Sequence, residues 1–119
     1  MNRRDDKVYL LHIRDAIGRI QTYLQDMDKA VFFERTLVQD GVIRQLEIIG
    51  EAVKRLSPEL RKQYRGIPWK NIAGMRDKLI HDYFGVDLEA VWKTAREDLP
   101  PLQVCVIEIL AFLEKKTGE

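Results

Sequence analysis

The residues best suited to chemistry are Arg76 and His81, which stand five positions apart in a stretch that also carries Asp77. On a helical wheel, Arg76 lies in the middle of an apolar face, where its five donors require an anionic partner, a ligand or an interface. Asp77 and His81 are four residues apart and therefore within contact of each other on a helix. A carboxylate beside an imidazole favours the protonated ring and fixes its orientation. The pattern indicates an anionic partner for Arg76 and a titratable imidazole at His81.

Purely structural roles explain Arg76 and His81 about as well as functional roles do. A buried ion pair would satisfy Arg76, and the dipole at a helix C-terminus would favour a charged His81. The two side chains also point about 140° apart on an ideal helix. A single substrate could reach both only through a bent helix end, a long reach of the arginine, or a second copy of the helix, which Gly74 would allow to approach closely.

The helices that must position these residues follow from the apolar spacing. Apolar side chains recur three and four positions apart from about residue 5 to 26 and again from about 34 to 56. The second helix is expected to continue through Asp40-Gly41, because the periodicity continues and an interior glycine costs only about 1 kcal/mol. The two predicted buried stripes are Leu10, Ile13, Ile17, Ile20 and Leu24, and Val42, Leu46, Ile49, Val53 and Leu56.

Prolines and capping residues divide the rest of the chain. Ser57-Pro58 opens a short helix, and a helix over about 69–82 carries Arg76 and His81. Another is expected over about 88–97, and Pro100-Pro101 precedes a last, mostly apolar helix at the centre of a bundle or in a subunit interface. Since no run alternates with period two, we predict an all-α fold, a single domain over residues 1–119 with four main helices and one or two short ones.

Charge is unevenly distributed, although the formal net charge is only +1. Residues 54–78 hold 8 basic and 2 acidic side chains, a local balance of +6, whereas residues 79–119 have a balance of −4. A basic stretch interleaved with Tyr64 and Trp69 is typical either of a nucleic-acid-binding surface or of an ordinary solvated surface. On charge alone the solvated surface is the more frequent case.

The composition excludes several classes of protein. A single cysteine, Cys105, cannot form an internal disulfide, and two histidines are too few for a zinc-type ligand cluster. Without an apolar run long enough for a membrane span or a signal peptide, we expect a cytoplasmic protein with no membrane association, metal or cofactor. Cys105 and Trp69 are expected in the core and His12 as a partly buried structural residue, while Glu51 either approaches the Arg76 site or is merely exposed or at an interface.

The stretch from Arg76 to Tyr83 resembles a known signature. Its first six residues match the R-x4-6-H motif of HEPN domains, and the extension to Tyr83 matches the R-x4-H-x-Y form of HepT-like toxins. Similarity to that family covers nearly the whole chain, including Leu46 to Ala52, Ile67 to Trp69, Ile72 to Gly74 and Tyr83 to Asp87. The resemblance implies a HEPN-type helical homodimer whose two motifs form one composite cleft.

The resemblance also implies a metal-independent endoribonuclease toxin, neutralised by a nucleotidyltransferase antitoxin that in some systems adds AMP to the motif tyrosine. By position, Arg76 and His81 would be catalytic, Asp77 and Tyr83 supporting, and Tyr83 the AMP acceptor. In metal-free RNA cleavage the ribose 2′-hydroxyl attacks the adjacent phosphate, with His81 as general base or acid and Arg76 neutralising transition-state charge. Candidate RNA-binding residues are Lys70, Lys78 and Arg65.

Two other functions fit the same residues. The chain could be a non-catalytic helical dimer that binds a nucleotide, RNA or a nucleotidyltransferase in the same cleft, without turnover. It could also be a dimerisation module in which Arg76 and His81 only tie helices together. RNA cleavage in EDTA that disappears in the His81→Ala and Arg76→Ala variants would separate the three.

Overall fold

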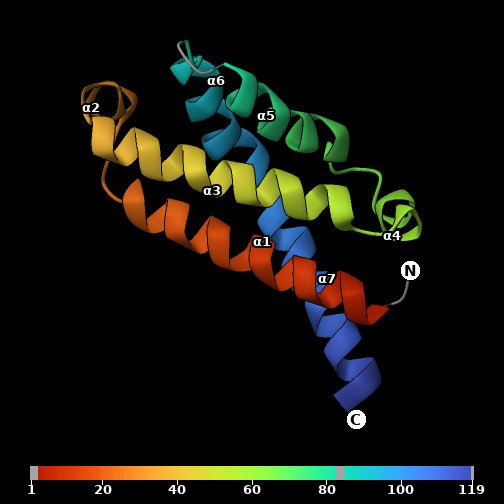
Figure 1. Cartoon of the computed structure of the whole chain (residues 1–119). Coiled ribbons are helices and arrows are strands. Elements are labelled where there is room, and N and C mark those ends of the chain that lie inside the picture. The colour runs from red at the N-terminus through yellow and green to blue at the C-terminus, as the bar shows by residue number, and fades with distance from the viewer. Residues whose placement is uncertain (1–2, 83–84, 119) are drawn as a thin grey trace.

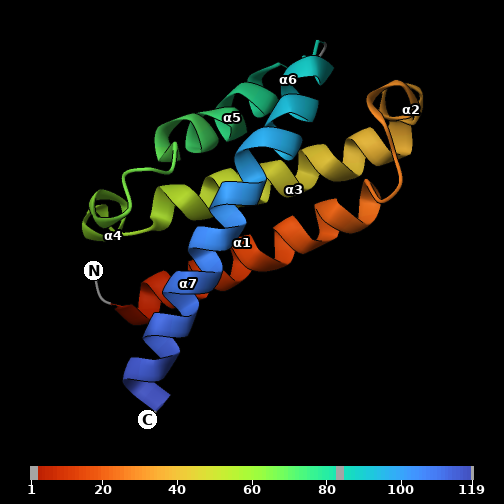
Figure 2. The ribbon, with the colours of Figure 1, turned by 180° about the vertical axis from the view of Figure 1, so that it is seen from behind.

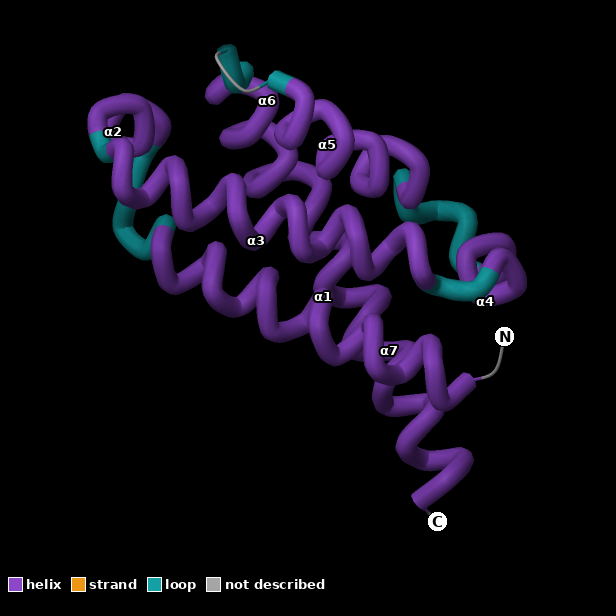
Figure 3. The backbone as a smooth tube through the Cα atoms, viewed as in Figure 1, coloured by secondary structure: helices purple, strands orange, loops and turns teal. Residues whose placement is uncertain are grey.

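The computed structural model describes residues 3–82 and 85–118, and within these ranges the chain is helical and contains no strand. The long helices are linked by short ones (Figures 1 and 3). In chain order the elements are α1 (Arg3–Tyr23), α2 (Lys29–Glu34), α3 (Thr36–Arg55), α4 (Pro58–Gln63), α5 (Trp69–His81), α6 (Leu88–Lys93), η1 (Thr94–Asp98) and α7 (Leu99–Gly118). The predicted all-α fold class is confirmed, and dimerisation stays a prediction.

Helix α3 is the centre of a layer, with α1 packed on one side of it and α5 on the other (Figure 1). Helix α7 crosses the back of this layer and packs on α1 (Figure 2). The opposite face of α1, α3 and α5 is therefore left uncovered by α7 (Figure 1).

The side chains buried between α1 and α3 are the ones that the apolar spacing predicts. Every member of the two predicted stripes is at most 4% exposed. Burying a leucine, isoleucine or valine side chain contributes about 1.5–3 kcal/mol, so these stripes are a principal source of stability. They hold α3 in the middle of the molecule.

The structure confirms that α3 continues through Asp40-Gly41. A Cβ atom at Gly41 would lie 3.1 Å from Cε2 of Tyr23, at the end of α1. The glycine therefore has a packing role as well, because its missing side chain makes room for the tyrosine ring.

The short segment between the two long helices predicted from the apolar spacing is not a simple connection. It contains the short helix α2, whose N-cap residue Asp28 accepts a hydrogen bond from the Val31 N–H at 2.9 Å. Phe32 on α2 is fully buried and in contact with the Trp92 ring, with a centroid distance of 5.3 Å. The capping carboxylate and this aromatic contact stabilise a helix too short for periodicity to reveal.

The expected break at Pro100-Pro101 was also wrong. Helix α6 passes through the π-helical turn η1 directly into α7, and the Leu99 N–H donates to the Thr94 carbonyl five residues earlier. Proline lacks an N–H and crowds the preceding turn, and the wider π turn accommodates both effects without ending the helix.

Helix α7 does not occupy the centre of the bundle. Leu102 and Val106 are fully buried, but Val104 and Ile107 are 59% and 51% exposed. The helix therefore covers one side of the layer, and the alternative that it belongs to a subunit interface stays a prediction. Among the described helices, none combines the length and apolar content that crossing a bilayer requires.

A buried carboxylate joins the start of α1 to the start of α4. Asp6, 4% exposed, accepts hydrogen bonds from the Ser57 N–H at 2.8 Å and the Ser57 hydroxyl at 2.7 Å. The Ser57 oxygen in turn caps α4 by accepting from the Leu60 N–H at 3.2 Å. The capping role of Ser57 was predicted, whereas its partner 51 residues away was not.

Candidate active site

The helix that carries the motif, α5, is held against α3 by its apolar side. Trp69, Ile72 and Leu79 are all less than 8% exposed. The Trp69 indole Nε1 donates to the Tyr64 carbonyl oxygen at 2.9 Å, which anchors the start of the helix. The predicted core position of Trp69 is confirmed, and the helix ends at His81 with Asp82 as its C-cap.

Gly50 permits the close approach of α3 and α5. A Cβ atom at this position would overlap Cβ of Arg76 and would lie 3.1 Å from the Ile72 carbonyl oxygen. The backbones of the two helices therefore meet at this glycine, directly beneath the arginine of the motif. Gly50 was not among the predicted site residues, although a small residue next to a buried stripe is a recognisable signal for close helix packing.

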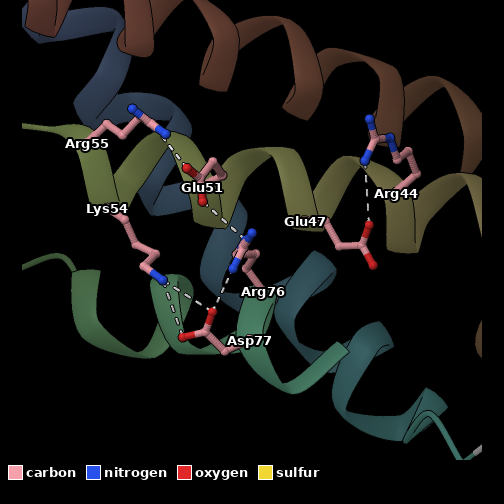
Figure 4. A network of polar contacts seen from close by, with 7 residues as sticks. All are labelled: Arg44, Glu47, Glu51, Lys54, Arg55, Arg76 and Asp77. Atoms are coloured by element: carbon pink, nitrogen blue, oxygen red, sulfur yellow. Dashed lines mark hydrogen bonds and ion pairs between the residues drawn. The ribbon is translucent and has the colours of Figure 1, made fainter. Parts of the chain in front are cut away.

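The Arg76 guanidinium is shared by two carboxylates (Figure 4). Its Nε lies 3.1 Å from Oε1 of Glu51 on α3, and its Nη1 lies 3.0 Å from Oδ1 of the neighbouring Asp77. Each carboxylate also meets a second cation. Glu51 Oε2 is 2.8 Å from Nε of Arg55, and Asp77 Oδ1 is 3.2 Å from Nζ of Lys54. An alternating chain of charges thus connects α3 to α5.

These contacts keep the network charged. The pKa of Glu51 is lowered, chiefly by its hydrogen bond to Arg55 and also by Arg76, against an opposing effect of desolvation. The pKa of Asp77 is lowered by Arg76 first and Lys54 second. Both carboxylates are therefore ionised at neutral pH, and Arg76, whose side chain is 32% exposed, stays accessible to an anionic ligand.

The structure does not pair Asp77 with His81 as expected. The Asp77 carboxylate turns to Lys54 and Arg76 (Figure 4), because the packing of α5 on α3 brings a cation opposite it. His81 is exposed at the end of α5. Tyr83, the predicted AMP acceptor, lies outside the described residues.

An open groove of about 350 Å³ lies beside Arg76, on the face that α7 leaves uncovered. Helix α3 lines most of it, α1 contributes one wall and α5 the other. Ile80 on α5 is 44% exposed and lines this groove. The lining residues are Tyr9, His12, Arg44, Glu47, Ile48, Glu51, Ala52, Arg55, Arg76 and Ile80.

His12 corrects another expectation. It is exposed rather than partly buried, and its ring makes an edge-on contact with the Tyr9 ring at a centroid distance of 6.3 Å. Periodicity placed it beside the buried stripe of α1, but His12 directly precedes the buried Ile13, and one residue turns a helix by about 100°, enough to move a side chain from the core to the groove. Glu51 does approach the arginine, which confirms the first of its two alternatives, and Cys105 is buried as predicted.

The basic stretch over residues 54–78 is partly neutralised. Lys54, Arg55 and Arg76 are engaged by carboxylates in the network above. The candidate RNA-binding residues Lys70, Lys78 and Arg65 are exposed. They do not belong to the described lining of the groove.

Residues 13–109 match the model of the family described as Ribonuclease HepT-like. The chain belongs to this family. In this HepT-like chain the motif residues Arg76 to His81 occupy the C-terminal part of α5, and the match covers α3, α5 and the groove between α1 and α5 except Tyr9 and His12.

Several relatives extend over most of the HepT-like chain. A protein of Thermococcus cleftensis named "Probable ribonuclease HepT" is 44% identical over 101 residues, covering 85% of this chain and 92% of its own. A protein of Methanocaldococcus jannaschii with the provisional name of RNase is 43% identical over 116 residues, covering 98% and 100%.

Another relative is longer. A second Methanocaldococcus jannaschii protein, named as a gamma-glutamylcyclotransferase and provisionally as an RNase, is 46% identical over 113 residues. The chain spans about half of that protein's length, 51%. The comparison with solved structures gives no match.

Proposed function

We propose that this HepT-like chain is a metal-independent endoribonuclease whose active cleft forms between two copies. The family indicates RNA as the substrate class. The observation that carries the proposal is the position of Arg76, whose guanidinium is held by two carboxylates at an open groove. On the same helix His81 is exposed to solvent. An arginine held in place suits the stabilisation of a phosphate, and an exposed imidazole suits proton transfer.

The reaction would use the RNA's own hydroxyl as nucleophile. The ribose 2′-oxygen attacks the adjacent phosphorus while an imidazole of His81 removes its proton. The bond from phosphorus to the 5′-oxygen then breaks, and a protonated imidazole supplies the proton that this leaving oxygen needs. The products are a 2′,3′-cyclic phosphate and a 5′-hydroxyl, and Arg76 stabilises the charge that develops on the phosphoryl oxygens.

A second copy of the chain supplies what one copy lacks. Arg76 faces α3, whereas His81 lies about 140° further round α5, so the two side chains of one copy do not converge on one phosphate. Two copies of α5 related by a twofold axis bring the arginine of one motif near the histidine of the other. Gly74 is exposed, and a Cβ atom there would meet nothing within 4 Å, which leaves room for a neighbouring backbone. Two copies also provide two imidazoles, one for each proton transfer.

The partner proposed for regulation is a nucleotidyltransferase antitoxin that adds AMP to Tyr83. In the sequence the modified tyrosine would follow His81 by two residues, so the added phosphate and nucleotide would stay close to the motif and obstruct RNA. Mass spectrometry would locate the modification, and full ribonuclease activity of the AMP-modified protein would contradict this part of the proposal.

The test of the activity is cleavage of RNA in the presence of EDTA. Loss of general acid–base catalysis typically costs about 10²–10⁴-fold, so His81→Ala should lower the rate by at least about 100-fold. Arg76→Ala should lower it comparably, while Arg76→Lys should recover only part, because a lysine does not reproduce the planar fork of a guanidinium. Lys93→Ala, which changes an exposed residue on α6, is the matched control.

Melting temperatures measured on the same variants separate the alternatives. RNA binding without turnover by the unaltered protein would instead favour the non-catalytic dimer. A lower melting temperature of the His81→Ala protein, with cleavage retained, would favour a purely structural role.

A further inference from the structure

The groove beside Arg76 has features that the catalytic roles of Arg76 and His81 do not require. It follows α3 from Arg44 to Arg55, which are eleven residues and so about 16 Å apart along the helix axis. It therefore extends well beyond the space that one phosphate at Arg76 would occupy. Most of its lining comes from α1 and α3 rather than from the motif helix.

The cations of the groove are arranged along its length. Arg44, Arg55 and Arg76 lie on it with side chains that are 70%, 58% and 32% exposed. Two carboxylates stand between them, and Glu47 is 3.7 Å from Arg44. The formal charge of the lining is +1 with His12 neutral. A phosphate that replaces Glu51 or Glu47 at one of these arginines meets a charge-assisted donor already directed into the groove.

The groove also presents rings and apolar surface to a ligand. Tyr9 and His12 form their edge-on pair on its α1 wall, and Ile48, Ala52 and Ile80 provide apolar contacts. Tyr9 is close enough to Arg55 to raise the pKa of that guanidinium, second to the effect of Glu51. Cations that follow a strand, next to rings on which bases stack, are the combination by which proteins bind single-stranded nucleic acid.

Other surfaces fit RNA less well. A larger hollow of about 560 Å³ near the end of α1 is lined by Asp26 and Asp28, and its arginine, Arg96, already donates to the Met27 carbonyl oxygen at 2.6 Å. Lys70 and Lys78 lie on α5, whose Trp69 is only 7% exposed. The Trp69 ring is therefore not available for stacking against a base next to these lysines.

We propose that this groove binds the single-stranded RNA nucleotides next to the cleaved phosphate, with a base against the Tyr9 and His12 rings and the backbone along Arg44 and Arg55. Glu47 and Glu51 then accept hydrogen bonds from base amino groups or ribose hydroxyls, as carboxylates do in nucleic-acid recognition. The inference rests on the proposed function for its choice of RNA. It places the strand across α3 toward α1, away from Lys70, Lys78 and Arg65.

The test is the affinity of the full-length protein for a short single-stranded RNA with 2′-O-methyl groups, which lacks the attacking hydroxyl and cannot be cleaved by this route. Fluorescence anisotropy at about 0.1 M salt measures it. Tyr9→Leu should weaken binding about tenfold through lost stacking. Arg44→Gln should weaken it and reduce the slope of log affinity against log salt by about 0.7, the change expected for one lost phosphate contact on a single strand.

Matched variants make the result specific. Arg19→Gln changes an exposed arginine on α1 outside the groove lining and should bind as the unaltered protein does. Because Arg44 is 70% exposed, Arg44→Gln should leave the melting temperature unchanged. Tyr9 is half-buried and its replacement could disturb folding, so the Arg44 variant tests the groove independently of that effect. Unchanged affinity in both groove variants, together with weaker binding by Lys70→Gln, would overturn the proposal.

The groove and the catalytic proposal fail in different ways. If the unaltered protein binds the RNA through the groove but cleaves no RNA in EDTA, the groove assignment stands and the catalytic proposal fails. If cleavage depends on His81 while Tyr9→Leu and Arg44→Gln leave RNA affinity and KM unchanged, the groove assignment fails alone. A change of sedimentation coefficient in these two variants with unchanged RNA affinity would mean that a second copy of the chain covers the groove, and would also overturn it.

Discussion

Replacing Gly50 by alanine should force α5 away from α3 and lower both stability and activity. The new Cβ would overlap Cβ of Arg76 and would stand 3.1 Å from the Ile72 carbonyl oxygen and 3.3 Å from Cα of Arg76. These are backbone atoms or atoms fixed to the backbone, so no flexible side-chain end can move aside. The two helices must separate, and the buried contacts of Ile72 and Leu79 loosen with them.

The expected magnitude is the difference of two effects. Overpacking a well-packed core costs about 1–3 kcal/mol, and rigid neighbours favour the upper end. Replacing a glycine by alanine inside a helix recovers about 1 kcal/mol. The net loss is therefore about 2 kcal/mol, which for a chain of this size lowers the melting temperature by roughly 8 °C.

The matched control is Gly18→Ala inside α1. A Cβ there would meet nothing within 4 Å, so the variant keeps only the helix-propensity gain of about 1 kcal/mol and should melt a few degrees higher. Thermal unfolding followed by circular dichroism compares the two variants, and ribonuclease assays show whether Gly50→Ala displaces Arg76 from Glu51. If Gly50→Ala is as stable as Gly18→Ala, α3 and α5 do not meet at Gly50.

Three further outcomes follow from particular contacts. Asp6→Ala should lower the melting temperature by roughly 4–12 °C, because the buried N–H and hydroxyl of Ser57 lose their acceptor at a cost of about 1–3 kcal/mol. An unchanged melting curve would mean that water replaces the carboxylate. In the folded protein the pKa values of Glu51 and Asp77 lie below their ordinary values of 4.5 and 3.8. Their ion pairs therefore stabilise the fold fully above pH 4.5, and this stabilisation is lost as the pH falls through the lowered pKa values of the folded state. Urea unfolding from neutral pH down to about pH 3 should therefore show a shallower loss for the double variant Glu51→Gln, Asp77→Asn, and parallel curves would contradict the pairing. Burial raises the pKa of the Cys105 thiol, so alkylation of the folded protein should be far slower than in denaturant, and equal rates would show that α7 opens readily.

Features that depend on neighbours along the chain could be predicted from the sequence. The buried stripes of α1 and α3, the cap at Ser57 and the helix that carries Arg76 all arise from spacings of a few residues, which the 3.6-residue repeat of a helix turns directly into a face. The resemblance to HepT-like proteins also came from a contiguous motif with its flanking segments, and the family match supports it. Short α2 and the π turn before Pro100 were missed, because a cap, one buried aromatic ring and a locally widened helix leave no periodic signal.

Contacts between helices were decided only by the tertiary structure. The spacing of Asp77 and His81 permitted one ion pair, but the structure pairs Asp77 with Lys54, 23 residues away, because the crossing of α5 over α3 brings that lysine opposite the carboxylate. The same crossing brings Arg76 into its ion pair with Glu51. It also leaves a groove beside the motif, which Arg44, Tyr9 and His12 help to line. A local pattern determines which face of a helix is buried, whereas the rotation and distance between two helices depend on the side chains at their contact. At Gly50 that contact is set by the absence of a side chain, and the surroundings of Arg76 follow from it.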